Sequence, residues 1–185
     1  MSKVYIFVAE GYEEIEGLTV VDLLRRAEIE ISIVSMTENK LVTGAHGIAT
    51  VTDMLFEDAN YEDADMLVLP GGMPGTLNLM QHEGLDKLLR RFANTEKTLA
   101  AICAAPRVLG SKGLLEGKKA TCYPGNEEYL IGAKFSEGEV VEDGNIVTSK
   151  GMGTSIDFAL TLIKRLKNVD EAERIASSII YRHYL

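Results

Sequence analysis

Apolar runs alternate with amphipathic stretches along the whole chain. The first run, residues 4–9, is apolar throughout, as expected for a strand that is covered on both faces. In residues 14–27 the apolar positions instead recur at the spacing of one helix face. By the same criteria the pattern predicts further strands at residues 30–35, 66–69, 98–102, 119–122 and 139–148, and further helices at residues 85–92, 105–109, 154–166 and 170–181.

Residues 41–53 interrupt this alternation. They contain Gly44 and Gly47 and predict a small hairpin or edge strands. Elsewhere strands alternate with helices, which is typical of an α/β fold with a doubly wound, mostly parallel sheet. No repeat, low-complexity segment or linker divides the chain, so we expect one domain over residues 1–185.

Composition narrows the classes of function. The chain has 185 residues and a formal net charge of -9, which argues against nucleic acids and anionic membrane surfaces as partners. No apolar run reaches the roughly 18 residues of a membrane span, and the short apolar start lacks the features of a signal peptide. We therefore expect a cytoplasmic protein whose two cysteines, Cys103 and Cys122, are both thiols.

Ligand sites in open α/β sheets form where the strands end. Cys103 follows the strand at residues 98–102 within Ala-Ile-Cys-Ala-Ala-Pro, and Pro106 stands where a helix can begin. Small residues around a nucleophile at a strand-to-helix turn are the plan of a nucleophile elbow, in which the helix start would lower the thiol pKa. The alternative is that Cys103 is a small buried apolar residue.

Three other strand ends carry residues of interest. Glu16 is either a buried carboxyl that hydrogen-bonds a thiolate or, like Glu13 and Glu14, an acid that favours a helix start. Gly71 and Gly72 provide either a tight turn, which the local sequence favours, or backbone N–H groups for an oxyanion. The glycine-containing run at residues 151–155 lacks the lysine and the spacing of a phosphate-binding loop.

The histidines offer no clear base for Cys103. His46 lies in the predicted hairpin, His82 at a helix start that we expect to be exposed, and His183 near the end of the chain. Their spacing with cysteines and acids fits no metal site, so we expect no metal. Cys122 is expected to be a core or sheet residue.

Four motifs together resemble the ThiJ/PfpI superfamily and, within it, the DJ-one branch. The motifs are Glu-Glu-Ile-Glu at residues 13–16, Leu-Pro-Gly-Gly at 69–72, Ala-Ala-Ile-Cys-Ala-Ala-Pro at 100–106 and Thr-Ser-Lys-Gly-Met-Gly-Thr-Ser at 148–155. The resemblance covers nearly the whole chain. It implies a flavodoxin-like sandwich with helices on both faces, a homodimer, and an elbow at Cys103.

The resemblance also implies roles for individual residues. Cys103 matches the reactive cysteine and Glu16 the protonated glutamate that hydrogen-bonds it. Gly71 and Gly72 match the glycines that line the pocket, and Ala104 supplies an N–H on the oxyanion side. Two further residues match positions near the dimer interface: Arg26, and His46 where some relatives carry an arginine.

Two departures bear on the activity. Tyr123 stands where many relatives have a histidine, which weakens a Cys-His dyad and a glutamine amidotransferase triad. Ala104 stands where the PfpI-type proteases carry a histidine, which argues against a protease. The resemblance favours a cofactor-independent glyoxalase or protein deglycase that acts on small dicarbonyls through Cys103 and Glu16. The alternative is a redox sensor or chaperone that uses the same cysteine, with an oxidant as its small-molecule partner and without turnover.

Overall fold

A seven-stranded sheet forms the centre of the computed structural model, which describes residues 2–182. Its strands lie in the order β10-β11-β7-β6-β1-β2-β5, and all neighbours are parallel except the antiparallel pair β10 and β11. The strands are β1 (Lys3–Val8), β2 (Glu30–Ser35), β5 (Met54–Leu55), β6 (Met66–Leu69), β7 (Thr98–Ile102), β10 (Val140–Asp143) and β11 (Ile146–Ser149). The predicted α/β class with a mostly parallel sheet is confirmed.

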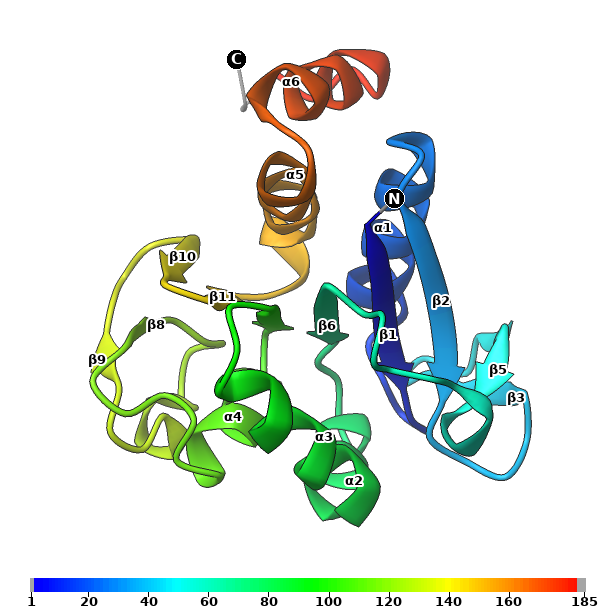
Figure 1. Cartoon of the computed structure of the whole chain (residues 1–185), viewed down its shortest axis with the longest axis vertical. Helices are drawn as coiled ribbons and strands as arrows, with labels where there is room; N and C mark the ends of the chain where they lie inside the picture. The colour runs from blue at the N-terminus through cyan, green and yellow to red at the C-terminus, as the bar shows by residue number, and fades with distance from the viewer. Residues whose placement is uncertain (1, 183–185) are drawn as a thin grey trace.

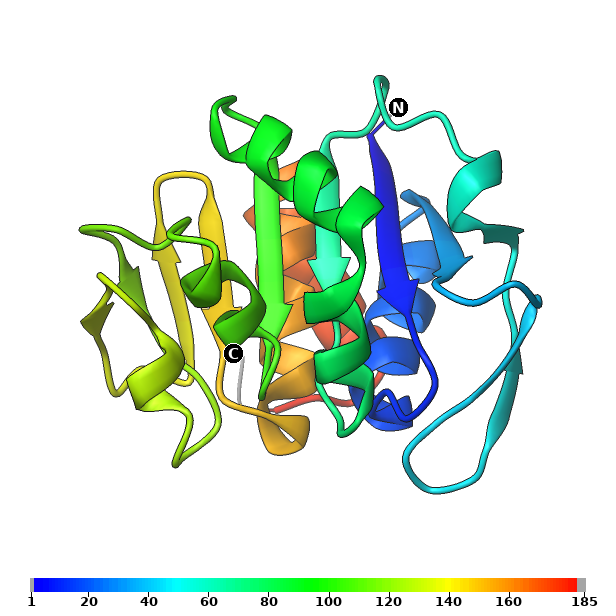
Figure 2. The ribbon, with the colours of Figure 1, turned by 90° about the horizontal axis from the view of Figure 1, so that it is seen from below.

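Helices cover both faces of the sheet (Figures 1 and 2). One face carries α1 (Glu14–Arg26), α5 (Ser155–Leu166) and α6 (Val169–Ser178), and the other carries α2 (Gly75–Gln81), α3 (Glu83–Ala93) and α4 (Pro106–Ser111). Alternate residues of β1 enter the two apolar cores, Ile6 on the α1 side and Phe7 on the α3 side. Burial on both faces explains why the strand is apolar throughout.

Several segments differ from the predicted elements. Helix α2 was not expected, and the strand predicted at 119–122 is only β8 (Lys119–Ala120), which pairs with β9 (Lys134–Phe135) outside the main sheet. The last helix begins one residue earlier than predicted because the side chain of Asn168 caps it, accepting a 2.9 Å hydrogen bond from the N–H of Glu171. That helix ends at Ser178 rather than near residue 181.

The 41–53 segment forms the predicted hairpin. It consists of β3 (Leu41–Thr43) and β4 (Ala49–Val51), which pair with each other apart from the main sheet. Three short 3₁₀ helices complete the described secondary structure: η1 (Phe56–Asp58), η2 (Glu127–Tyr129) and η3 (Met152–Thr154). Within residues 2–182, no helix combines the length and the apolar character needed to span a membrane.

The register of the parallel strands brings four chain segments to one edge of the sheet. Ser149 pairs with Ile102, and Leu69 pairs with the residue before Ile102. The segments that follow β1, β6, β7 and β11 therefore leave the sheet side by side. These are the four strand ends that the sequence singled out.

Candidate active site around Cys103 and Glu16

Cys103 occupies a strained turn between β7 and α4. Its φ is 63°, in the left-handed region that non-glycine residues seldom adopt. Its N–H donates a 2.9 Å hydrogen bond to the carbonyl of Ser149, which ties the turn to the end of β11. Pro106 occupies the first turn of α4, where its missing N–H does no harm. The strand, turn and helix of the predicted elbow are thus present, with a partly exposed thiol at the turn.

Glu16 lies beneath this turn, in the first turns of α1. Its side chain is 1% exposed, and Oε2 accepts a 2.9 Å hydrogen bond from the N–H of Gly71. Its other oxygen, Oε1, has no hydrogen-bond partner among the described residues. Burial raises the pKa of Glu16 to about 7, although interactions with the Cys103 thiol and the Gly71 N–H act in the opposite direction. Near neutral pH the carboxyl therefore exists in both protonation states.

The thiol and the carboxyl share one electrostatic site. Burial and the adjacent ionised Glu16 raise the pKa of Cys103 to about 12, while the N–H groups of Ala104 and Gly72 lower it. The sequence-based expectation of a lowered thiol pKa is therefore wrong while Glu16 is ionised. Protonation of Glu16 removes the repulsion and makes the carboxyl a hydrogen-bond donor. The thiol and the carboxyl interact closely enough to shift each other's pKa. Oε1 of Glu16 has no hydrogen-bond partner among the described residues, so a proton bound to this oxygen would need an acceptor there.

Gly71 and Gly72 have different structural reasons for being glycine. A Cβ added at Gly71 would lie 2.7 Å from both the Cβ of Cys103 and Oε2 of Glu16, so only glycine lets the three segments meet. Gly72 has a φ of 88°, which confirms the tight-turn interpretation. Since its N–H also hydrogen-bonds the thiol, Gly72 contributes to the electrostatics of the site as well.

Tyr123 borders the site on another side. Its N–H donates a 2.8 Å hydrogen bond to the carbonyl of Cys103, and its ring packs beside Gly151. No histidine within residues 2–182 takes part in the site: His46 lies at the hairpin and half-buried His82 caps α3. His183 lies outside the described residues. Cys122 is buried in the core on the face opposite to the one that Cys103 packs against.

Glu14 has a role that the sequence did not suggest. It is buried, and its carboxylate accepts hydrogen bonds from the N–H groups of His46 (2.8 Å) and Ile48 (3.3 Å) and contacts the His46 ring (3.1 Å). Interpreting it only as an acid at a helix start was therefore wrong, because it fastens the β3–β4 hairpin to α1. Glu13, Glu14 and His46 bring ligand-type atoms within 4.8 Å of one another, but both oxygens of Glu14 already accept hydrogen bonds.

Arg26 lies at the far end of α1 from Glu16. It is half exposed and pairs with Asp22 at 2.6 Å. Neither Arg26 nor His46 is among the groups that mainly shift the pKa of the Cys103 thiol. Their placement near a dimer interface stays a prediction, since the structure describes one chain.

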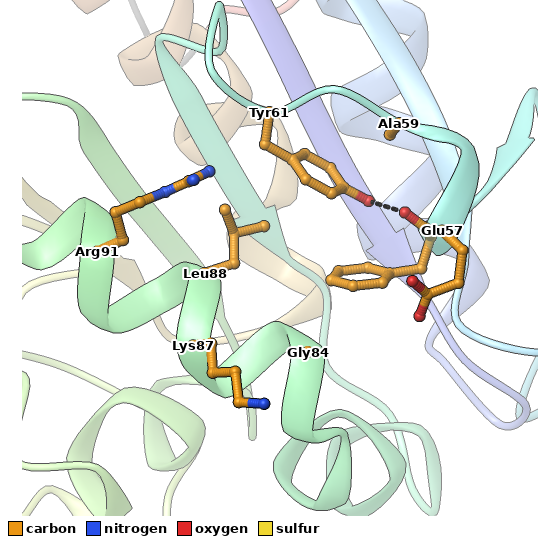
Figure 3. A pocket seen from close by; sticks show the side chains of 8 residues that line it. Glu57, Ala59, Tyr61, Gly84, Lys87, Leu88 and Arg91 are labelled. Atoms are coloured by element: carbon orange, nitrogen blue, oxygen red, sulfur yellow. Dashed lines mark hydrogen bonds between the residues drawn. The ribbon is translucent and has the colours of Figure 1, made fainter.

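A hollow of about 310 Å³ lies apart from this site, between η1 and α3 (Figure 3). Its lining residues are Phe56, Glu57, Ala59, Tyr61, Gly84, Lys87, Leu88 and Arg91. The Tyr61 hydroxyl donates a 2.8 Å hydrogen bond to the carbonyl of Phe56, which fixes one wall. Neither Cys103 nor Glu16 lines the hollow, so we place the chemistry at the strand ends.

Known proteins share this arrangement of motifs and fold. A family model described as the DJ-1/PfpI family matches residues 2–165. The chain belongs to this family. The family resemblance inferred from the four motifs is thereby confirmed.

Individual relatives of the DJ-1/PfpI family agree with this assignment. The chain is 38% identical to Protein DJ-1 homolog B of Arabidopsis thaliana over 97% of its own length and 42% of that protein, so it spans less than half of this relative. It is 34% identical to a protein named deglycase from Pyrococcus horikoshii, over 89% of this chain and 99% of that protein. A structure titled Toxoplasma gondii DJ-1, oxidized, superposes with a TM-score of 0.94 at 36% identity, covering 98% of this chain and 99% of the other.

Two features of this DJ-1/PfpI site were missed at the level of sequence. The contact between Tyr123 and Gly151 joins segments that are far apart in the chain, so no local pattern marks it. The hydrogen bonds of Glu14 depend on how the hairpin folds back onto α1. The sequence did carry one signal for this role of Glu14. In the motif Glu-Glu-Ile-Glu, Glu14 is separated by only one residue from Glu16, whose carboxyl was a candidate for burial, so more than a helix start was indicated.

Proposed function

We propose that the protein is a cofactor-independent enzyme that converts small 1,2-dicarbonyls, such as methylglyoxal, into hydroxy acids, with the same chemistry applicable to deglycation. The observation that carries the proposal is the pairing of a partly exposed thiol with a buried carboxyl whose pKa lies near neutrality. Such a carboxyl can both accept and donate a proton at physiological pH. The deglycase name of the archaeal relative supports the same class of chemistry.

The first step forms a covalent intermediate at Cys103. The thiol proton moves to the Glu16 carboxylate as the sulfur bonds to the aldehyde carbon, and Glu16 then passes this proton to the aldehyde oxygen to give a hemithioacetal. The N–H groups of Gly72 and Ala104, which hydrogen-bond the sulfur, are the donors that would stabilise negative charge on that oxygen. Transfer of the proton within the pair avoids the cost of a free thiolate beside an ionised carboxyl.

The second step is an internal redox change followed by hydrolysis. Glu16 removes the proton from the former aldehyde carbon, the hydroxyl proton of that carbon moves to the ketone oxygen, and Glu16 then delivers its proton to the neighbouring ketone carbon. The first carbon is thereby oxidised and the second reduced, which leaves a thioester of the hydroxy acid. Water then cleaves the carbon–sulfur bond, releasing the hydroxy acid and the Cys103 thiol. No external oxidant or reductant enters this sequence, and that is why the proposal needs no cofactor.

The test is lactate formation from methylglyoxal, followed by NMR without added thiol. Wild type should produce lactate, Cys103→Ser should produce none, and Glu16→Gln should be slower by roughly 10²-fold or more, the typical contribution of a general acid–base group. Cys122→Ser is the matched control because Cys122 is buried on the other face of the sheet. Lactate formation by Cys103→Ser would overturn the proposal.

A second candidate is a redox sensor or chaperone that uses Cys103 without turnover. It is favoured by the contrast between the partly exposed Cys103 and the buried Cys122, because oxidation follows exposure as well as thiolate character. The solved structure of the Toxoplasma gondii relative is described as oxidized. Absence of lactate from wild type, together with selective oxidation of Cys103, would favour this candidate.

Two further properties stay proposals. We propose that two chains form a homodimer, as the family resemblance implies, and that the protein acts in the cytoplasm on a small-molecule aldehyde or oxidant. Light scattering at several concentrations would test the first, since a single mass near the 20.2 kDa of one chain would contradict it.

A further inference from the structure

The hollow between η1 and α3 combines an apolar lining with charged groups at its rim (Figure 3). Tyr61 and Leu88 are only 8% and 5% exposed, and Phe56 is half-buried. The volume of about 310 Å³ lies at the lower end of the range of small-molecule sites, which are mostly apolar with a few polar groups. The hollow therefore suits a small ligand that has a flat, apolar part.

The aromatic part of the lining is held rigidly. The centroids of the Phe56 and Tyr61 rings lie 5.2 Å apart, and the Tyr61 hydroxyl donates its hydrogen bond to the Phe56 carbonyl. Phe7 of β1 packs behind both, with its ring centroid 6.0 Å from that of Phe56 and 5.8 Å from that of Tyr61. Neither ring can swing away without losing these contacts. An aromatic ligand would therefore meet a surface that needs no rearrangement before it binds.

Arg91 places an unpaired cation at the rim of the hollow. The next residue on α3, Arg90, is paired with Asp86 at 3.1 Å, whereas the Arg91 side chain forms no ion pair or hydrogen bond within residues 2–182. Lys87, one helical turn earlier and also at the rim, is unpaired within the same range. Like charges four residues apart on a helix repel each other. A bound anion would reduce this repulsion.

The charged groups also give a bound ligand its orientation. Arg91 and Tyr61 line a second hollow of about 250 Å³ as well, which lies farther along α3. Glu57 lies on the side of the first hollow opposite to Arg91 (Figure 3). An anionic group therefore belongs at the Arg91 side, away from the Glu57 carboxylate. A guanidinium group matches a carboxylate because it can donate two parallel hydrogen bonds to it.

We infer that this hollow is a binding site for a planar aromatic carboxylate. The carboxylate lies at Arg91, and the ring lies against Leu88 and the rigid aromatic wall. Neither Cys103 nor Glu16 lines the hollow. The site is therefore separate from the proposed reaction, and it would stand even if the protein turned over no dicarbonyl.

Titration with 2-naphthoate, followed by amide NMR, tests the inference. The Gly84 and Leu88 signals should shift, while those of Cys103 and Ala104 should not. Two probes separate the contributions: 2-naphthamide keeps the rings without the charge, and acetate keeps the charge without the rings. Both should bind at least fivefold more weakly than 2-naphthoate. Equal affinity for either probe, or 2-naphthoate shifts centred on Cys103, would overturn the inference.

Two substitutions at the rim should change the affinity for 2-naphthoate in opposite directions. Arg91→Gln should weaken binding by roughly fivefold or more, as expected when hydrogen bonds to a charged group are lost at a partly exposed site. Glu57→Gln should strengthen binding by about twofold, because it removes a negative charge that opposes the ligand. Damage to the fold would weaken binding in both variants, so the opposite signs distinguish the two explanations.

Lys134→Gln is the matched control. Lys134 is exposed on β9, outside the lining of the hollow, and it forms no ion pair in the described part of the chain. Its substitution removes the same charge as Arg91→Gln and should leave the affinity unchanged. An equal loss of affinity in Arg91→Gln and Lys134→Gln would mean that 2-naphthoate responds only to net charge. That result, or an affinity that Arg91→Gln does not change, would contradict the site.

Discussion

The N–H of Gly71 donates a 2.9 Å hydrogen bond to the Glu16 carboxyl, and the two residues are 55 positions apart in the chain. This contact joins the end of β6 to the first turns of α1 directly beneath Cys103. It holds one carboxyl oxygen while the other has no partner among the described residues. The site therefore contains a buried acid that is fixed at one atom and available at the other.

The raised pKa of Glu16 makes stability depend on pH. Its pKa rises from 4.5 to about 7 on folding, so the folded protein binds a proton more tightly than the unfolded chain does. The stability is fully present below pH 4.5 and is lost as pH rises through about 7. Between about pH 5 and about pH 8 the loss is about 2–3 kcal/mol, at roughly 1.4 kcal/mol for each pKa unit.

Urea unfolding of wild type and Glu16→Gln at those two pH values measures this effect. The glutamine can still accept the Gly71 hydrogen bond but does not titrate, so the stability of the variant relative to wild type should increase as pH rises. A difference in unfolding free energy that stays constant with pH would show that Glu16 is ionised in the folded protein throughout the range.

The glycine at position 71 provides a steric test of the site. In Gly71→Ala the added methyl group would clash with Cys103 and Glu16. We expect a loss of about 1–3 kcal/mol in stability, typical of overpacking, and a fall in turnover of at least tenfold. Gly153→Ala is the matched control, because a Cβ there meets nothing within 4 Å and its φ is not in the left-handed region. Similar activity of Gly71→Ala and Gly153→Ala would contradict the close approach at residue 71.

The contacts that these tests address differ in how well the sequence alone predicts them. The α/β class and most strands follow from apolar runs such as residues 4–9, whose burial on both faces needs no tertiary knowledge. Cys103 could be placed at a turn because Pro106 and the small residues around it constrain the backbone locally. The pKa of the thiol could not be predicted, because it depends on the protonation of Glu16 and on N–H groups from two loops.

Short elements and capping contacts were the least predictable. Helix α2 has only seven residues, which is too short for an apolar stripe to be distinguished from a loop. Residues 121–122 have the composition of a strand, but they lie beyond the two-residue pairing of β8 with β9. Tertiary pairing outweighs strand propensity there.

The hairpin contact of Glu14 has its own pH dependence. Burial acts to raise the pKa of Glu14, but hydrogen bonds from its own backbone and from His46 and Ile48 outweigh it, so its pKa is lowered. Glu14 also raises the pKa of His46. The Glu14 contribution is present above pH 4.5 and lost as pH falls through the lowered pKa, and the His46 contribution is present below pH 6.5 and lost as pH rises through the raised pKa.

Amide hydrogen exchange checks this assignment. In Glu14→Gln, protection of the His46 and Ile48 amides should fall by roughly tenfold or more, as expected when hydrogen bonds to a charged acceptor are weakened. The Leu69 amide in the central strand β6 is the internal reference for global stability. Equal loss of protection at Leu69 and Ile48 would show that Glu14 stabilises the whole fold and not the hairpin in particular.

Selective oxidation of Cys103 is the prediction that bears on the sensor candidate. Cys103 is partly exposed whereas Cys122 is 1% exposed, so mild peroxide should modify the first thiol and spare the second. Peptide mass spectrometry should find a gain of about 32 Da, two oxygen atoms, on the Cys103 peptide alone. The Glu16 carboxyl, when protonated, can donate a hydrogen bond to the resulting sulfinate. In Glu16→Gln the sulfinate should therefore give way more readily to a product heavier by about 48 Da, the sulfonic acid. Oxidation of both cysteines at similar rates would mean that the described burial does not govern their reactivity, and absence of the 32 Da product from wild type would count against the sensor.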